Sequence, residues 1–196
     1  MSTPTYPVRT ARLDLRPYTD ADLDFVLACR SDPAQTRYVP FDVVGGEEEA
    51  QAVLVQKVYR SAAREPGEPI QLVAELRATN EPVGEATLVW ASEVHQGGEV
   101  GYLVLPGHQG RGYATEMAAA MLRLAFQEFG WHRVTARLDA RNDASVAVCE
   151  RLGMRLEAHL LQNEWVKDEW TDELDYAMLA AEWPASKAAG LSRWVP

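Results

Sequence analysis

The sequence predicts one mixed α/β domain, and three observations support this prediction. The chain has 196 residues, a length that suits a single domain with a substantial core. Hydrophobic residues make up 47% and charged residues 24% of the chain, which is typical of globular proteins and excludes a disordered or fibrous one. Runs that alternate like strands are interspersed with runs of helical periodicity, without an internal repeat or a linker between them.

A strand and two helices are expected first. Residues 8–16 alternate as in a short strand. Thr19 and Asp22 have the spacing of a capping box, which predicts a helix after them. A second helix is expected over 47–64, because three acidic residues fall in its first turn, where the helix dipole favours them.

A β-hairpin is predicted next, because two strand-like runs, 70–78 and 82–90, flank a tight turn at Asn80. The later elements follow from the same periodicity and from glycine punctuation. They are a strand over 99–106, a loop over 107–112, a long helix from about Tyr113, a strand over 132–140, a helix over 142–152 that Gly153 ends, and strands at about 154–165 and 170–180.

Charge and cysteine content narrow the classes of function. The chain has 19 basic and 29 acidic residues, and the net charge of −10 argues against binding to nucleic-acid phosphates. Cys29 and Cys149 are far apart and lack the spacing of metal ligands, so no zinc site or disulfide framework is expected. Neither a signal peptide nor an apolar membrane span is recognisable. We therefore expect a cytoplasmic protein without a nucleic-acid or membrane partner.

The segment LPGHQGRGYATEM (105–117) is the most informative part of the sequence. Its glycines permit positive φ, and the N–H groups and dipole at the start of the following helix suit an anion. A pyrophosphate is the expected ligand. The segment lacks the Lys-Ser/Thr of a P-loop and does not match GxGxxG. The alternative is a tight strand–helix connection that binds nothing.

Within this segment, Gln109-Gly110-Arg111-Gly112-Tyr113-Ala114 fits the Q/R-x-x-G-x-A motif, so the chain resembles the GNAT acetyltransferases. The preceding EVGYLVLP is similar to the splayed strand of that family. TARLDLRPYTDADLDFV and ARLDARNDASVAVCERLGM resemble the RimJ/RimL-like subgroup. The resemblance covers 8–183 and implies the GNAT acyl-CoA N-acyltransferase fold, a mostly antiparallel central sheet with a splayed parallel pair, flanked by helices. No role is assigned to the tail, 184–196.

The resemblance also implies that acetyl-CoA is the co-substrate. Backbone amides from Gln109 to Thr115 would hold its diphosphate, with the Arg111 side chain as an addition. The alternative for Arg111 is a solvated loop cation. N–H groups near Leu103 and Val104 would polarise the thioester carbonyl as an oxyanion hole does.

Two polar residues of the later helix complete the implied cofactor site. The resemblance implies that Asn142 holds the pantetheine arm and that Ser145 lies near the thioester sulfur, where it would protonate the departing thiolate. Asn is also a favoured N-cap, so the alternative for Asn142 is a capping role.

Amine attack requires a proton acceptor, because amines are largely protonated at neutral pH. Glu164 resembles the base of RimL-type enzymes, and an apolar wall from Trp165 would raise its pKa. The alternative is an exposed carboxylate on an edge strand. His108 and His159 are further candidates for the base.

The acceptor is expected to be an amine, and its identity is left open. The region 156–183 holds eight acidic residues and one basic residue, Lys167, with tryptophans between them, which suits a cationic acceptor. The alternative is a solvated acidic face. Resemblance favours the α-amine of a peptide or protein over a small cationic amine such as an antibiotic, a polyamine or an amino-acid derivative.

Two other classes of function are alternatives to an enzyme. They are a non-catalytic acyl-CoA sensor and a nucleotide-binding module that uses the same glycine loop. Homodimers are common in the resembling subgroup, so a homodimer is one expected assembly.

Overall fold

The computed structural model describes residues 4–185 and arranges them around an eight-stranded sheet. The strand order is β1-β2-β3-β4-β5-β6-β8-β7, and all neighbours are antiparallel except β5 and β6. This confirms the predicted mixed α/β fold with one parallel pair. The strands are β1 (Val8–Arg9), β2 (Leu13–Pro17), β3 (Pro69–Leu76), β4 (Pro82–Ser92), β5 (Gly97–Val104), β6 (Arg133–Asp139), β7 (Arg155–Val166) and β8 (Glu169–Leu179).

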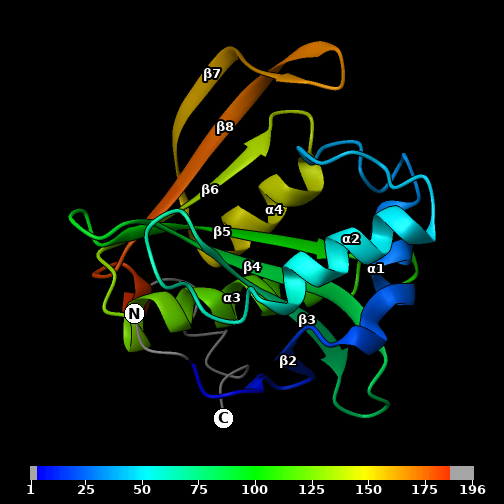
Figure 1. Cartoon of the computed structure of the whole chain (residues 1–196). Coiled ribbons are helices and arrows are strands. Elements are labelled where there is room, and N and C mark those ends of the chain that lie inside the picture. Colours follow the sequence, from blue (N-terminus) through cyan, green and yellow to red (C-terminus); the bar gives the residue numbers. More distant parts are fainter. Residues whose placement is uncertain (1–3, 186–196) are drawn as a thin grey trace.

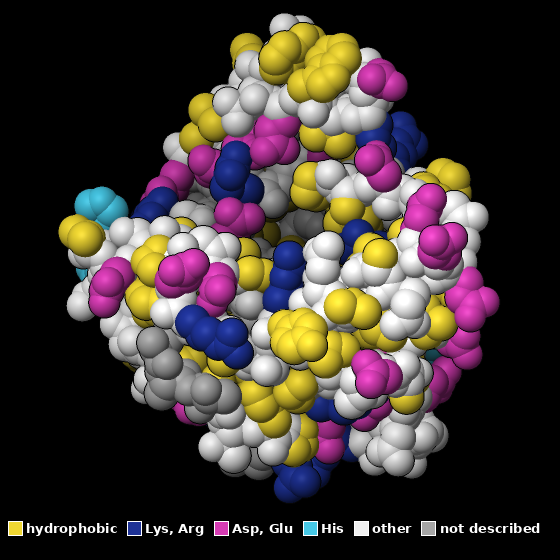
Figure 2. All heavy atoms as spheres, in the orientation of Figure 1, with side chains coloured by type: hydrophobic (Ala, Val, Ile, Leu, Met, Phe, Trp, Pro, Cys, Tyr) yellow, Lys and Arg dark blue, Asp and Glu magenta, His cyan; other side chains and the backbone are white. Residues whose placement is uncertain are grey.

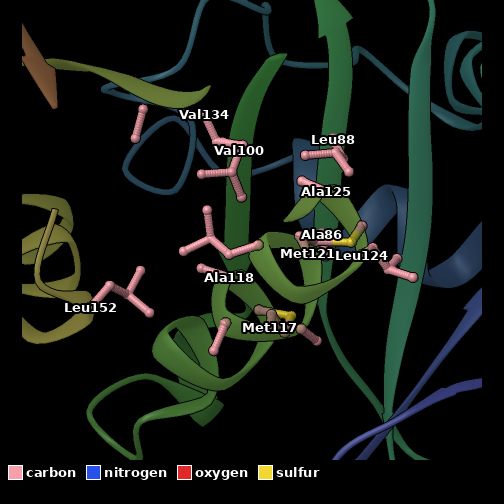
Figure 3. Packing of buried hydrophobic residues seen from close by; sticks show 14 of the residues in the cluster. Ala86, Leu88, Val100, Met117, Ala118, Met121, Leu124, Ala125, Val134 and Leu152 are labelled. Carbon is pink, nitrogen blue, oxygen red and sulfur yellow. The ribbon is translucent and has the colours of Figure 1, made fainter. Parts of the chain in front are cut away.

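Helices cover both faces of the sheet (Figure 1). On one face, α3 and α4 pack with residues such as Met121, Leu152 and Val100 in the larger core cluster (Figure 3). On the other face, α1 and α2 pack around Val73 and Leu54. The helices are α1 (Leu23–Arg30), α2 (Glu47–Val58), α3 (Tyr113–Arg123) with a π-helical continuation over Leu124–Glu128, and α4 (Asp143–Leu152).

Two predicted elements differ from the structure. The single strand expected over 8–16 is folded into β1 and β2, because the Thr10 N–H donates to the Leu13 carbonyl at 2.9 Å and closes a tight turn. The helix expected over 47–64 ends at Val58. There the Arg60 carbonyl accepts the Gln71 N–H of β3 at 2.7 Å, which commits the chain to the sheet.

The other elements lie where they were predicted, within a few residues. The capping box is present, and the Thr19 N–H donates to the Asp22 carboxylate at 2.7 Å. Gly153 ends α4 with a φ of 81°, a left-handed conformation that favours glycine. No helix within residues 4–185 has the length and apolar character needed to cross a membrane. Of the predicted tail, 184–196, the part from residue 186 onward lies outside the described residues.

The parallel pairing of β5 with β6 is short, so the sheet is open between the carboxyl-terminal halves of these two strands. β5 and β6 pair only over 97–99 and 133–135, although β5 continues to Val104 and β6 to Asp139. The two strands therefore diverge toward their carboxyl ends (Figure 1). The predicted splay is confirmed.

The β7–β8 hairpin projects from the body of the domain beyond β6 (Figure 1). Lys167 and Asp168 connect its strands with φ of 51° and 62°, as a type I′ turn requires. A bulge interrupts the pairing between Leu160 and Glu164. Such bulges turn the following side chains in a new direction, and they are frequent beside active sites.

Candidate active site

A cavity of about 190 Å³ opens where β5 and β6 separate. Figure 2 shows the hollow between the β7–β8 hairpin and the α1–α2 side, with acidic and basic side chains around it. The segment between α1 and α2 closes one side, and the Lys167 ammonium at the hairpin tip donates to the Thr36 carbonyl of that segment. The wall consists of Tyr38, Pro40, Glu99, Arg137, Leu138, Asp139, Glu164, Val166, Thr171 and Glu173.

Arg137 connects the carboxylates of this cavity. Its guanidinium donates to Glu173 at 2.7 Å and to Glu164 at 3.3 Å, and it lies 3.7 Å from Asp175. Burial raises the pKa of the Glu173 carboxyl, although the hydrogen bond from Arg137 opposes this shift. The wall carries four carboxylates and one guanidinium, so the cavity has a negative balance that attracts cations.

Glu99 is a wall residue that the sequence analysis missed. It is half-buried, and burial raises its pKa, while Arg137 nearby lowers it. The alternation of side chains along β5 could have identified it. Val100 lies in the core, so the neighbouring Glu99 faces the opposite side of the sheet. The roles of Arg137 and Glu173 depend on the pairing of β6 with β8, which the sequence pattern did not reveal.

Glu164 lines the cavity just after the bulge in β7. Its side chain is 42% exposed, so it is accessible from solvent and from the cavity. Trp165 lines a second, shallower hollow together with Glu164, so the apolar neighbour expected for this carboxylate stays a prediction. The Trp165 ring also packs edge-on against the Trp170 ring, with the centroids 5.4 Å apart.

The glycine loop has the conformation that its residues predict. Gly110 and Gly112 have φ of 72° and 81°, and Gly112 is the N-cap of α3. The N–H groups of the first helical turn lack partners inside the helix, which is the geometry that binds phosphates. The Gln109 side chain donates to the Val104 carbonyl at 3.0 Å and so ties the loop to β5. The loop and the start of α3 thus have the backbone geometry of an anion site.

The amides of Leu103 and Val104 differ in direction. The Leu105 N–H donates to the Val83 carbonyl of β4 at 2.9 Å. Because backbone groups alternate along a strand, the Leu103 N–H faces β4 and the Val104 N–H faces the side of β6. Pairing with β6 has ended there, so the Val104 N–H is the amide directed toward the splay.

Asn142 and Ser145 lie together at the start of α4. The Asn142 side-chain oxygen accepts the Ser145 N–H at 3.1 Å, so the capping role considered for Asn142 is present. Tyr102 of β5 donates to the Ser145 carbonyl at 3.2 Å and joins this helix end to the splayed strand. Neither Asn142 nor Ser145 belongs to the wall of the carboxylate cavity.

Replacement of Asn142 by alanine is expected to lower the free energy of unfolding by about 0.5–2 kcal/mol, because the cap of α4 is lost. Urea unfolding followed by circular dichroism measures the change. Asn142→Asp retains an oxygen acceptor and is the control, with stability expected near that of the wild type. Equal stability of Asn142→Ala and the wild type would contradict the capping role.

The two histidines considered as bases do not line the cavity. His159 pairs with Asp172 at 3.0 Å on the hairpin, and His108 pairs with Glu81 at 3.3 Å. Three other acidic residues over 156–183 form ion pairs with arginines outside the cavity wall. Glu157 pairs with Arg133 and Arg155, Glu169 with Arg141, and Glu182 with Arg155.

Comparison with known proteins gives the family. An acetyltransferase (GNAT) domain is matched over residues 12–155. The uncharacterised N-acetyltransferase YnaD of Bacillus subtilis is 30% identical over 176 residues, which are 90% of this chain and 98% of YnaD. The crystal structure of a GNAT-family acetyltransferase from Bacillus anthracis superposes with a TM-score of 0.79 at 28% identity, over 89% of this chain and 98% of that one.

A spermidine N-acetyltransferase from Vibrio cholerae, solved with CoA and spermine, has the same fold. Its TM-score is 0.74 at 19% identity, over 88% of this chain and 98% of that one. The chain belongs to the GNAT acetyltransferases. The RimJ/RimL-like subgroup stays a prediction.

Proposed function

We propose that the protein transfers the acetyl group of acetyl-CoA to a primary amine by direct attack within a ternary complex. The observation that carries this proposal is that two candidate binding sites lie on either side of the point where β5 and β6 separate. The glycine loop before α3 suits a diphosphate, and a carboxylate-lined cavity lies where β5 and β6 separate. Substrates entering from these two sides would meet along β5.

The proposed reaction follows from these residues. The amine nitrogen attacks the thioester carbonyl carbon, whose oxygen accepts from the backbone N–H of Val104, the amide directed toward the splay, and not from that of Leu103, which faces β4. Glu164 accepts the amine proton, directly or through water, the carbon–sulfur bond breaks, and Ser145 protonates the thiolate. Solvent then takes the proton from Glu164 and returns one to Ser145. The products are the acetylated amine and CoA. Amides of 109–115 hold the diphosphate, and Asn142 orients the pantetheine arm besides capping α4.

The proposed acceptor is the α-amine of a peptide or protein, from the resemblance to the RimJ/RimL-like subgroup. The acidic wall supports a second candidate, a small cationic amine. The spermidine N-acetyltransferase that has this fold also supports a small cationic amine as the acceptor. Either acceptor requires a neutral nitrogen at the thioester, so the proton acceptor is needed in both cases.

An acceptor panel tests the proposal. CoA release and product mass are measured with acetyl-CoA and peptides with free N-termini, the same peptides blocked at the N-terminus, polyamines, aminoglycosides and free amino acids. Product from free peptides and none from blocked ones would support the peptide acceptor. Product from polyamines or aminoglycosides alone would assign the small cationic amine. CoA binding without any product would favour the sensor, and ATP or NAD competing with CoA would favour the nucleotide-binding module.

A homodimer through β7 is proposed as the assembly. Apolar side chains are visible at the outer end of the β7–β8 hairpin (Figure 2). β7 is the edge strand of the sheet, and the hairpin as a whole exposes five large apolar side chains. They are Leu156, Leu160, Leu161, Trp165 and Trp170.

Light scattering after size exclusion is expected to give a dimer mass, and Leu161→Glu is expected to give a monomer. A monomeric wild type at micromolar concentration would contradict this assembly. The cytoplasmic location stays a prediction.

A further inference from the structure

An ion pair between a buried carboxylate and a half-exposed guanidinium lies at the start of α3. Glu116, in the first turn of this helix, is fully buried. Its carboxylate accepts the Arg12 N–H at 2.9 Å, the Arg12 Nε–H at 2.8 Å and the Thr10 hydroxyl at 2.6 Å. The guanidinium also lies 2.8 Å from the second carboxylate oxygen. The turn between β1 and β2 is thus hydrogen-bonded to the first turn of α3, the helix that follows the glycine loop.

From this anchor, Arg12 reaches the loop itself. Its Nη1 donates to the Arg111 carbonyl at 3.0 Å, and its guanidinium lies over the Tyr113 ring at 4.6 Å. A Cβ added to Gly112 would lie 3.5 Å from Nη2. One side chain therefore contacts Arg111 and Tyr113 of the proposed diphosphate site and lies beside Gly112 between them.

The contact with Arg111 orients an amide. In a trans peptide the C=O and the next N–H lie in one plane and point in opposite directions. Holding the Arg111 carbonyl toward Arg12 therefore directs the Gly112 N–H away from Arg12. Arg12 also neutralises Glu116, whose charge in the first helical turn would otherwise oppose a bound diphosphate.

We propose that Arg12, anchored by Glu116, is a positioning residue that sets the 109–113 loop for the diphosphate of acetyl-CoA. This inference rests on the proposed function. It assigns Arg12 no contact with the reacting atoms, so its effect should depend on whether the thioester carries a diphosphate.

The test compares two acetyl donors, acetyl-CoA and S-acetylpantetheine, which lacks the diphosphate and the nucleotide. Arg12→Ala is expected to raise KM for acetyl-CoA by about 10- to 100-fold, the scale of a lost charged hydrogen bond or of a displaced binding group. The kinetics with S-acetylpantetheine are expected to stay within about twofold of the wild type, because this donor does not use the loop.

Further variants separate positioning from folding. Arg12→Ala leaves the buried Glu116 unpaired and risks unfolding, so Arg12→Ala with Glu116→Gln removes the stranded charge as well. This double variant is expected to melt near the wild type and still to show the raised KM for acetyl-CoA. Arg77→Ala is the matched control, since Arg77 donates to the Thr10 carbonyl of the same turn without a contact to the loop.

Equal losses with both donors in the double variant would overturn the inference, because they indicate a general structural role. Unchanged kinetics with both donors would overturn it too. A wild type that uses neither donor would instead refute the proposed function, so the two failures are distinguishable.

Discussion

Replacement of Glu164 by glutamine is expected to lower kcat by about 10²–10⁴-fold, the usual contribution of a general base. Glu164 lines the cavity, is accessible to an incoming amine, and is held 3.3 Å from Arg137. Glutamine preserves the shape of the side chain and removes the basic oxygen, so KM for acetyl-CoA should change little. Steady-state kinetics across a pH range measure the effect, and activity should recover at high pH, where the amine is already neutral.

Glu99→Gln is the matched comparison for this prediction. Glu99 lies in the same wall and has a pKa raised by burial, which would also suit a proton acceptor near neutral pH. A small effect of Glu99→Gln beside a large effect of Glu164→Gln supports the proposed base. A large loss in Glu99→Gln with an active Glu164→Gln would contradict it and transfer the role to Glu99.

Replacement of Gly98 by alanine is expected to be the most destabilising of the substitutions that add only a methyl group to β5. An added Cβ would lie 2.1 Å from the Trp131 ring and 2.3 Å from the Val89 carbonyl oxygen. A backbone oxygen cannot escape by changing rotamer, so β5 must move. Overpacking of this kind costs about 1–3 kcal/mol and sometimes more. Activity should fall as well, because Gly98 lies in the short parallel pair beside Glu99.

Chemical unfolding and thermal melting measure this effect. Gly101→Ala is the control on the same strand, because its added Cβ would meet only the Thr87 Cβ at 3.7 Å, an ordinary contact. Gly101→Ala is expected to melt near the wild type. Equal stability of Gly98→Ala and Gly101→Ala would contradict the close packing of Gly98 against Trp131 and the Val89 carbonyl.

Local patterns in the sequence predicted most of the fold. The glycines at 110 and 112 mark the left-handed positions before α3, and Gly153 marks the end of α4. The breaks at Thr10 and Arg60 were missed, because each depends on hydrogen bonds with residues whose pairing a local pattern does not specify. Elements with strong periodicity were therefore easier to place than their ends.

The candidate site was predicted less completely than the fold. Glu164 and the glycine loop were singled out, since motifs within one segment carry them. Glu99 and Arg137 were not, because they meet only through the register of β5, β6 and β8. The pair formed by Arg12 and Glu116 joins residues 104 positions apart and has no local signal.

The most direct test of the account is the transfer of an isotope-labelled acetyl group from acetyl-CoA to an amine, followed by mass spectrometry of the amine and of the protein. Direct attack predicts labelled acetyl-amine and an equal amount of free CoA, with no label covalently bound to the protein at any time. Tight CoA binding without a labelled amine would contradict the transferase. Label that appears first on the protein and then on the amine would contradict direct attack.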